Sequence, residues 1–168
     1  MHRRPPRLKA FDYRGLHRYF LTGCTRHRAP AFLDPAFAAH ATSLLLHCAE
    51  RSRFEVTAYC LMPDHAHVLL SAQDDAAALR ECWFAWRQRT GFTWRLAAGQ
   101  RPWQDGSWDY VLREHDDSRA FAAYLVHNPV RAGLVATPSD YPWLGSGPYS
   151  IQELVDAVQI GPPRRPRE

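Results

Sequence analysis

Two histidines separated by one residue could hold a metal ion. His65 and His67 lie in the stretch HAHVLLS, and side chains two apart on a β-strand point to the same face of the sheet. At a rise of about 3.3 Å per residue, the two imidazoles start about 6–7 Å apart and can converge on one cation. Many His-x-His pairs bind no metal. They lie on a polar face of a sheet, and their histidines form hydrogen bonds with neighbouring residues or water. Two imidazoles are too few for a complete site, so a metal site needs a third ligand from elsewhere.

A tyrosine and an asparagine four residues apart could complete such a site. In a helix, Tyr124 and Asn128 lie on one face, one turn from each other. A phenol, with an ordinary pKa of about 10, attacks a phosphodiester when a cation stabilises the developing charge. Other interpretations stay open: Tyr124 could be a core aromatic, and Asn128 could cap a new turn that begins at Pro129. His115 and His127 are rival ligands.

The elements that must position these residues follow the order β-α-β-β-α-β-α. Residue patterns predict strands over about 16–25, 54–62, 65–71 and 108–112, and helices over about 35–51, 76–96 and 118–127. Asp34 and Asp117 are suited to cap helices, and Pro129 ends or redirects the last one. This order is typical of an α+β, ferredoxin-like fold, in which an antiparallel sheet has helices packed on one face.

Length and composition predict one domain with basic ends. We expect a basic N-terminal tail over 1–15, the body of the domain over 16–136, and a C-terminal wrapping loop and basic tail over 137–168. Hydrophobic residues make up 46% of the chain, which excludes a disordered protein. No apolar run approaches the roughly 18 residues of a membrane span. The four cysteines form no CxxC pair, which fits reduced thiols and a cytoplasmic location.

The positive charge is concentrated in separate tracts and comes almost entirely from arginine. The formal net charge is +4, and Lys9 is the one lysine among 21 basic residues. The planar guanidinium binds phosphate through two parallel hydrogen bonds and stacks on bases, so these tracts suit a polyanionic partner. An ordinary solvated surface with an arginine bias would look the same, and charge alone does not decide between them.

Two longer segments carry a resemblance to a known family. Residues 59–70 read YCLMPDHAHVLL, and residues 124–135 read YLVHNPVRAGLV. Together with 19–25 (YFLTGCT) and 108–113 (WDYVLR), which occur in the expected order, they resemble the HUH single-tyrosine transposases. Among these, the chain looks most like the REP-associated tyrosine transposases of bacteria. The resemblance spans roughly residues 16–145.

The resemblance implies an endonuclease and strand transferase that acts on single-stranded or hairpin DNA with palindromic repeats. It implies that His65, His67 and Asn128 bind Mg²⁺ or Mn²⁺, and that Tyr124 attacks the scissile phosphate. The products would be a 5′-phosphotyrosine linkage and a free 3′-OH, formed by a monomer or a homodimer. The covalent linkage preserves the bond energy, so strand transfer needs no ATP.

Seven arginines are expected to contact the DNA. They are Arg14, Arg18, Arg26, Arg28, Arg80, Arg87 and Arg131. The chain departs from the family pattern at Ala66, where a bulky residue is usual between the histidines, and Asn128 replaces the Gln of many insertion-sequence members. The alternatives are a domesticated regulator that binds hairpins with cleavage dispensable, and a metal hydrolase in which Tyr124 only packs.

Overall fold

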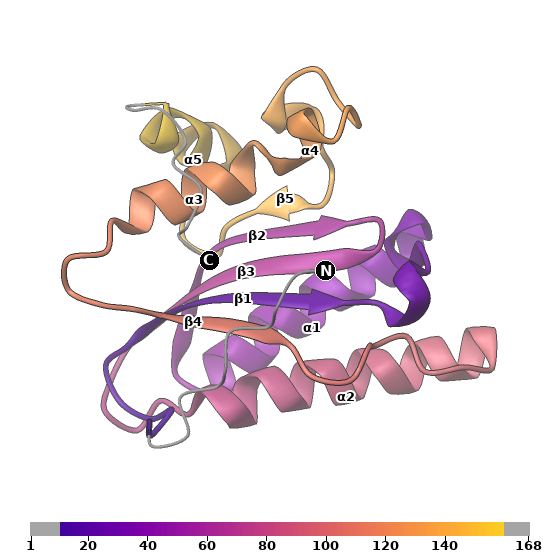
Figure 1. The fold of residues 1–168 in the computed structure, drawn as a ribbon, viewed down its shortest axis with the longest axis horizontal. Helices are drawn as coiled ribbons and strands as arrows, with labels where there is room; N and C mark the ends of the chain where they lie inside the picture. Colours follow the sequence, from indigo (N-terminus) through magenta and orange to yellow (C-terminus); the bar gives the residue numbers. More distant parts are fainter. Residues whose placement is uncertain (1–10, 160–168) are drawn as a thin grey trace.

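A five-stranded antiparallel sheet forms the centre of the molecule. The computed structural model describes residues 11–159. The strands are β1 (Arg18–Cys24), β2 (Phe54–Met62), β3 (His65–Ala72), β4 (Trp108–Leu112) and β5 (Leu144–Gly145). Their order across the sheet is β4-β1-β3-β2-β5, so β1 and β3 lie inside the sheet and both outer strands are short (Figure 1).

The β2–β3 hairpin sets the register of the whole sheet. Pro63 and Asp64 form the turn, and alternate residues of β3 then face opposite sides. His67 pairs with Cys60 of β2 on one side and with Thr22 of β1 on the other. Residues paired directly across antiparallel strands present their side chains on the same face, so Thr22 and Cys60 flank His67.

Two long helices cover one face of the sheet, as predicted. They are α1 (Pro35–Arg51) and α2 (Leu79–Ala98). The Asp34 carboxylate caps α1 by accepting hydrogen bonds from the backbone N–H groups of Ala36 and Phe37. Trp86 is fully buried between these helices, where its indole N–H donates to the Ala41 carbonyl. The α+β class and the antiparallel sheet with helices packed on it are therefore confirmed.

The opposite face carries a second layer that the expected arrangement did not contain. It consists of α3 (Ser118–Val126), α4 (Asn128–Arg131) and α5 (Ile151–Val158) (Figure 1). Phe20 and Leu69 of the sheet pack with Leu125 of α3 and Leu154 of α5 in one apolar cluster. The strand pattern requires such a cover, because β1, β2 and β3 are apolar on both faces. The sheet is thus the middle of three layers.

The C-terminal segment also differs from the expected wrapping loop. It pairs with the edge of β2 through β5 and then forms α5, which begins with a capping box between Ser150 and Glu153. At the other end, Tyr13 of the expected basic tail is buried in the core. The remaining parts of the two predicted tails, 1–10 and 160–168, lie outside the described residues. Within the described part of the chain, no helix is both long enough and apolar enough to cross a membrane.

Candidate metal and tyrosine site

The two histidines of β3 meet on the face covered by α3. Their ring centroids are 4.7 Å apart, with the rings nearly perpendicular. Ala66 and Val68 point to the other face and are fully buried against the α1 and α2 layer. Because successive side chains of a strand face opposite sides of the sheet, both imidazoles lie on the face opposite to the α1 and α2 layer, next to each other.

Each imidazole is oriented by a neighbour through its Nδ1 atom. Nδ1 of His67 lies 2.9 Å from the Thr22 hydroxyl oxygen, and Nδ1 of His65 lies 2.6 Å from an Asp64 carboxylate oxygen. Asp64 is held in turn by Arg28, whose guanidinium is 3.4 Å away. These contacts leave the Nε2 atoms as the nitrogens that a cation could take, and neighbours of this kind fix the ring orientation of metal-binding histidines.

The electrostatic environment favours neutral imidazoles. Burial lowers the pKa of His67 well below its ordinary value, and nearby His65, Arg131 and Arg28 lower it further. Burial also lowers the pKa of His65, although Asp64 opposes this shift. Neutral imidazole is the form that binds a cation, so both side chains are in the ligating state near neutral pH.

Tyr124 stands directly beside this pair. Its ring centroid is 5.6 Å from that of His67 and 6.0 Å from that of Phe20, and both contacts are edge-on. The side chain is half-buried at the margin of the apolar cluster under α3. Tyr124 therefore packs as an aromatic residue and also presents its phenol next to the histidines, so the two interpretations of this residue are not exclusive.

Arg131 also contacts the tyrosine. Its guanidinium carbon lies 4.4 Å from the centre of the Tyr124 ring, and one guanidinium nitrogen donates to the Tyr124 carbonyl at 2.6 Å. The helix is broken here, because Pro129 has no N–H to continue the ladder, and α3 gives way to α4 at His127. The guanidinium thus satisfies a carbonyl at the end of α3 and stacks on the ring of the same residue.

The side-chain amide of Asn128 lies at the start of α4. Asn128 is the first residue of α4, and His127 occupies the cap position before it. The Asn128 side-chain nitrogen is buried and has no hydrogen-bond partner among the described residues. A buried polar atom left unsatisfied costs about 1–3 kcal/mol. The amide can turn over to present its oxygen instead, so this group fits a role as an oxygen ligand.

The rival histidines lie in less suitable places. His115 is exposed, and its nearest ionic neighbour is Asp116, 4.0 Å away. His127 ends α3 and is half-buried, and burial followed by Arg131 lowers its pKa. Within residues 11–159, no three side chains among His, Cys, Asp and Glu form a metal-binding group. The donors established on this face are therefore the two imidazoles of His65 and His67.

The structure distributes the seven predicted DNA-contacting arginines over several places. Arg28 and Arg131 lie at the histidine and tyrosine cluster, as described above. Arg18 hydrogen-bonds to the Ser118 hydroxyl and the Arg113 carbonyl, and thereby ties β1 to the start of α3. Arg14 forms an ion pair with Glu81 at 2.5 Å, and Arg26 is exposed beyond the end of β1. Arg80 and Arg87 belong to α2, on the opposite face of the sheet.

Comparisons with known proteins bear on this arrangement. Residues 15–80 match the family described as IS200-like transposases. A Haemophilus influenzae protein, provisionally named a REP-associated tyrosine transposase, is 28% identical over 140 residues, which cover 74% of this chain and 77% of that protein. The REP-associated tyrosine transposase of Escherichia coli K12 is 31% identical over 93 residues, covering 54% of this chain and 53% of that protein.

A solved structure shares the fold. It is that of a REP-associated tyrosine transposase bound to a REP hairpin, and it matches with a TM-score of 0.66 and 22% identity. The match covers 83% of this chain and 82% of that one. At this identity, the likeness shows a common fold. Taken together with the sequence relatives, it confirms that the chain resembles the IS200-like transposases and, among them, the REP-associated tyrosine transposases.

Proposed function

We propose that this protein is a transposase-like DNA endonuclease and strand transferase that cleaves single-stranded or hairpin DNA through Tyr124. The relatives support a DNA-processing enzyme of the transposase type. The observation that carries the proposal is the position of the Tyr124 ring, 5.6 Å from His67 and 4.4 Å from the Arg131 guanidinium. A half-buried phenol beside a pair of imidazoles and a guanidinium is suited to attack a phosphodiester.

The reaction would exchange one phosphoester bond for another. The Tyr124 oxygen forms a bond to the scissile phosphorus and loses its proton, the bond from phosphorus to the 3′ oxygen breaks, and that oxygen leaves with a proton as a free 3′-OH. The fragment on the 3′ side of the cleavage position stays joined to the protein through its 5′-phosphate, as a 5′-phosphotyrosine. A 3′-OH can then attack this linkage in the reverse sense and join a strand without an external energy source. Arg131 lies beside Tyr124, and its charge would offset that of the phosphate.

A divalent cation is part of the proposal, and we expect Mg²⁺ or Mn²⁺. His65 and His67 would hold it through imidazole nitrogen and Asn128 through its amide oxygen. When bound, such an ion polarises the phosphate and stabilises negative charge in the transition state. The buried, unpartnered amide of Asn128 supports this assignment. Thr22 and Asp64 would keep the two rings in place, because each contacts an Nδ1 atom.

The substrate we propose is a hairpin formed by a palindromic repeat. The structural relative is described as bound to a REP hairpin. We infer the same class of partner for this chain, because the two folds correspond over most of their length.

Trapping the covalent product tests this proposal. The protein is incubated with 5′- and 3′-labelled hairpin oligonucleotides and Mn²⁺, and the products are separated under denaturing conditions. We expect an adduct that retains the 3′ label while the 5′-labelled fragment is released, and this adduct should be absent with EDTA and in Tyr124→Phe. Tyr149→Phe is the matched control, since Tyr149 is an exposed tyrosine outside the site. Cleavage that survives in Tyr124→Phe would contradict the tyrosine mechanism, and hairpin binding without any adduct would favour a regulator.

A further inference from the structure

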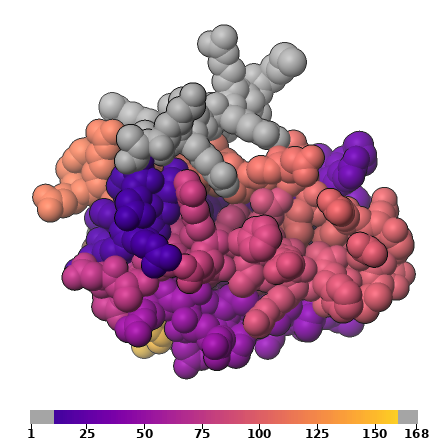
Figure 2. Space-filling view, turned by 90° about the horizontal axis from the view of Figure 1, so that it is seen from below, coloured from indigo at the N-terminus to yellow at the C-terminus, as the bar shows by residue number. Residues whose placement is uncertain are grey.

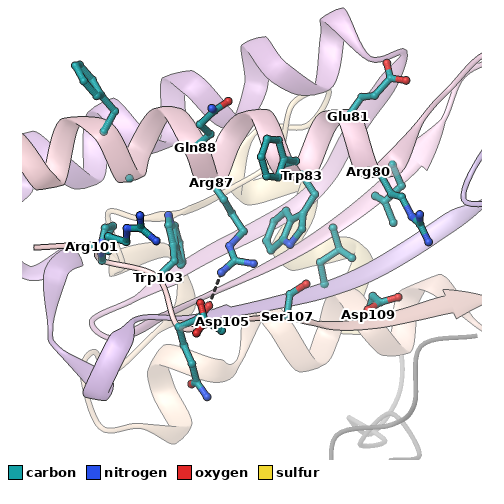
Figure 3. A pocket seen from close by; sticks show the side chains of 18 of the residues that line it. Arg80, Glu81, Trp83, Arg87, Gln88, Arg101, Trp103, Asp105, Ser107 and Asp109 are labelled. Atoms are coloured by element: carbon teal, nitrogen blue, oxygen red, sulfur yellow. Dashed lines mark hydrogen bonds between the residues drawn. The ribbon is translucent and has the colours of Figure 1, made fainter.

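A large groove lies on the face of the molecule opposite to Tyr124. Its volume is about 860 Å³, and it runs between α2 and the segment 101–109 that leads into β4. The two walls lie side by side at the surface in the view from below (Figure 2). Figure 3 shows Arg80 and Gln88 on the helical wall, and Arg101 and Trp103 on the other. The reaction assigned to the histidine and tyrosine cluster makes no use of this groove.

Two phenylalanines on the helical wall are exposed. Phe84 is 68% and Phe92 65% accessible, and both line the groove with Gln88 between them. Positions 84, 88 and 92 follow each other at four-residue intervals, so they form one stripe along α2. The two rings are about 12 Å apart along the helix axis, from a rise of about 1.5 Å per residue. Exposed aromatic side chains gathered in a groove indicate a binding surface.

The floor of the groove is rigid. Trp83 and Trp103 are buried there, each packed against Trp86 with ring centroids 4.8 and 5.0 Å apart. The Trp103 indole N–H also donates to the Thr90 hydroxyl at 3.0 Å. Gly23 of β1 permits this packing, because a side chain there would come within 3.1 Å of Trp83. The floor therefore presents a fixed apolar surface.

Arginines alternate with these aromatic surfaces. Arg80, Arg87, Arg95 and Arg101 all line the groove. The Arg87 guanidinium lies 5.5 Å from the centre of a Trp103 ring and donates to the Gln104 carbonyl at 2.5 Å (Figure 3). Three acidic residues also line the groove: Glu81, Asp105 and Asp109. Glu81 forms an ion pair with Arg14. Among the exposed arginines that line the groove, Arg95 and Arg101 are the nearest to Phe92 in sequence.

We propose that this groove binds an unpaired stretch of the DNA strand. Flat exposed rings beside guanidinium groups match a chain of flat bases joined by phosphates, because stacking on aromatic side chains requires bases that are free of a duplex. Phe84 and Phe92 would stack with bases, and Arg95 and Arg101 would contact the phosphates. An apolar protein segment would use the phenylalanines but leave the arginines without partners, so charge favours nucleic acid. The inference rests on DNA being the substrate, but it does not rest on cleavage by Tyr124.

The groove would hold the part of the substrate that extends beyond the duplex. The sheet separates it from the histidine and tyrosine cluster, so it contributes to affinity and not to the chemical step. Changes in the groove should therefore raise the dissociation constant and KM and leave the cleavage rate of the bound complex unchanged.

Binding measured without metal tests the groove separately from catalysis. Fluorescence anisotropy in EDTA compares a hairpin that carries a single-stranded extension with the same hairpin without it, using Tyr124→Phe as the parent protein. We expect Phe84→Ser combined with Phe92→Ser to weaken binding of the extended hairpin by at least about tenfold, and to leave the blunt hairpin within about twofold. Leu96→Ser is the matched control, because Leu96 is equally exposed on α2 but outside the groove.

Charge is tested by salt dependence. Arg95→Gln combined with Arg101→Gln should reduce the slope of log Kd against log salt by about 1.4 for the extended hairpin, from about 0.7 for each phosphate contact with a single strand. Arg51→Gln, which removes an exposed arginine at the end of α1, is the control. An unchanged affinity and slope in both double variants would overturn the proposal.

Two further measurements keep the test decisive if a variant misfolds or the surface binds something else. In the unaltered chain, 2-aminopurine placed in the extension should lose fluorescence on binding, as a base does when it stacks, and unchanged fluorescence at every position would count against the groove. Sedimentation of the DNA-free protein detects a second copy. A dimer that the phenylalanine variants abolish, with DNA binding intact, would assign the groove to self-association instead. Failure to form an adduct would leave these results intact and would count only against the tyrosine chemistry.

Discussion

The two faces of the sheet differ in the side chains that lie on them. The face under α3 brings two imidazoles beside the phenol ring of Tyr124, and the exposed guanidinium of Arg131 stacks on that ring. The face under α2 has a groove of about 860 Å³ lined by exposed aromatics and arginines. This groove has no histidine among its lining residues.

This difference separates two requirements of a DNA-processing enzyme. Chemistry needs a few groups held rigidly, and this is provided by neighbours such as Thr22, Asp64 and Arg131. Affinity for a long polyanion needs area and spread-out charge, which a groove supplies. Since the sheet lies between the two regions, changes in one should alter rate and changes in the other should alter binding.

The largest effect is expected at His67. His67→Gln removes one proposed metal ligand and should lower the rate of adduct formation by more than about 1000-fold, because the protein would lose the cation that we propose stabilises the developing charge. Binding of the extended hairpin in EDTA should stay within about twofold of the parent. Rates are measured in single turnover over a range of Mn²⁺ concentrations. Full activity at ordinary Mn²⁺ would show that His67 is no ligand, and impaired binding in EDTA would break the separation of the two faces.

Thr22 is expected to give the next largest effect. Its hydroxyl lies 2.9 Å from Nδ1 of His67, and Thr22→Val keeps the shape of the side chain while removing this contact. Groups that hydrogen-bond to a metal-binding imidazole contribute about 10–100-fold in metal affinity or activity. We expect the Mn²⁺ concentration at half-maximal rate to rise in that range. Thr57→Val, at a half-buried position of β2, is the control.

Arg131 should show a smaller effect on rate. Arg131→Lys keeps the charge but loses the planar group that stacks on Tyr124 and donates to its carbonyl. We expect the single-turnover rate to fall by about tenfold while KM changes little, since the loss is in the position of the nucleophile. A rise in KM with an unchanged rate would instead assign Arg131 to simple phosphate binding.

A substitution at Gly23, the neighbour of Thr22 in β1, tests the face of the sheet that is covered by α2. Gly23→Ala places a methyl group 3.1 Å from Trp83 and 3.3 Å from Trp103, whose rings are held by their packing with Trp86. We expect a loss of about 1–3 kcal/mol in the free energy of unfolding, measured by urea denaturation, and binding of the extended hairpin weakened by about threefold. The single-turnover rate at saturating DNA should not change, in contrast to Thr22→Val one residue away.

Much of the fold follows from local signals in the sequence. The strand 108–112 was predicted at the bounds observed, and the hairpin of β2 and β3 differs by one residue at its end. Asp34 and Asp117 cap α1 and α3 as expected, because a carboxylate before a helix satisfies free backbone N–H groups. Pro129 redirects the chain as predicted. These features depend on neighbours in sequence, so the sequence alone is sufficient to find them.

The features that the sequence did not reveal were missed for different physical reasons. Helix α5 carried a readable signal, since Ser150 and Glu153 form a capping box before Leu154 and Val155, but the surrounding Pro, Gly and Ser residues suggested a loop. The contact of Arg131 with Tyr124 depends on the break between α3 and α4. The groove joins α2 to the segment 101–109, and no spacing rule connects a helix with a coil segment that folds back along it.

The register of β1 against β3 has a consequence for errors in folding. Thr22 pairs with His67, and its neighbour Gly23 pairs with Ala66. Because alternate residues face opposite sides, a slip of one residue would turn Thr22 toward the tryptophans and Gly23 toward the imidazoles. A single misaligned strand would then disable catalysis and DNA capture together. Such a chain could keep near-native secondary structure, so inactive and non-binding protein with a native-like circular dichroism spectrum would be the mark of this misfolded form.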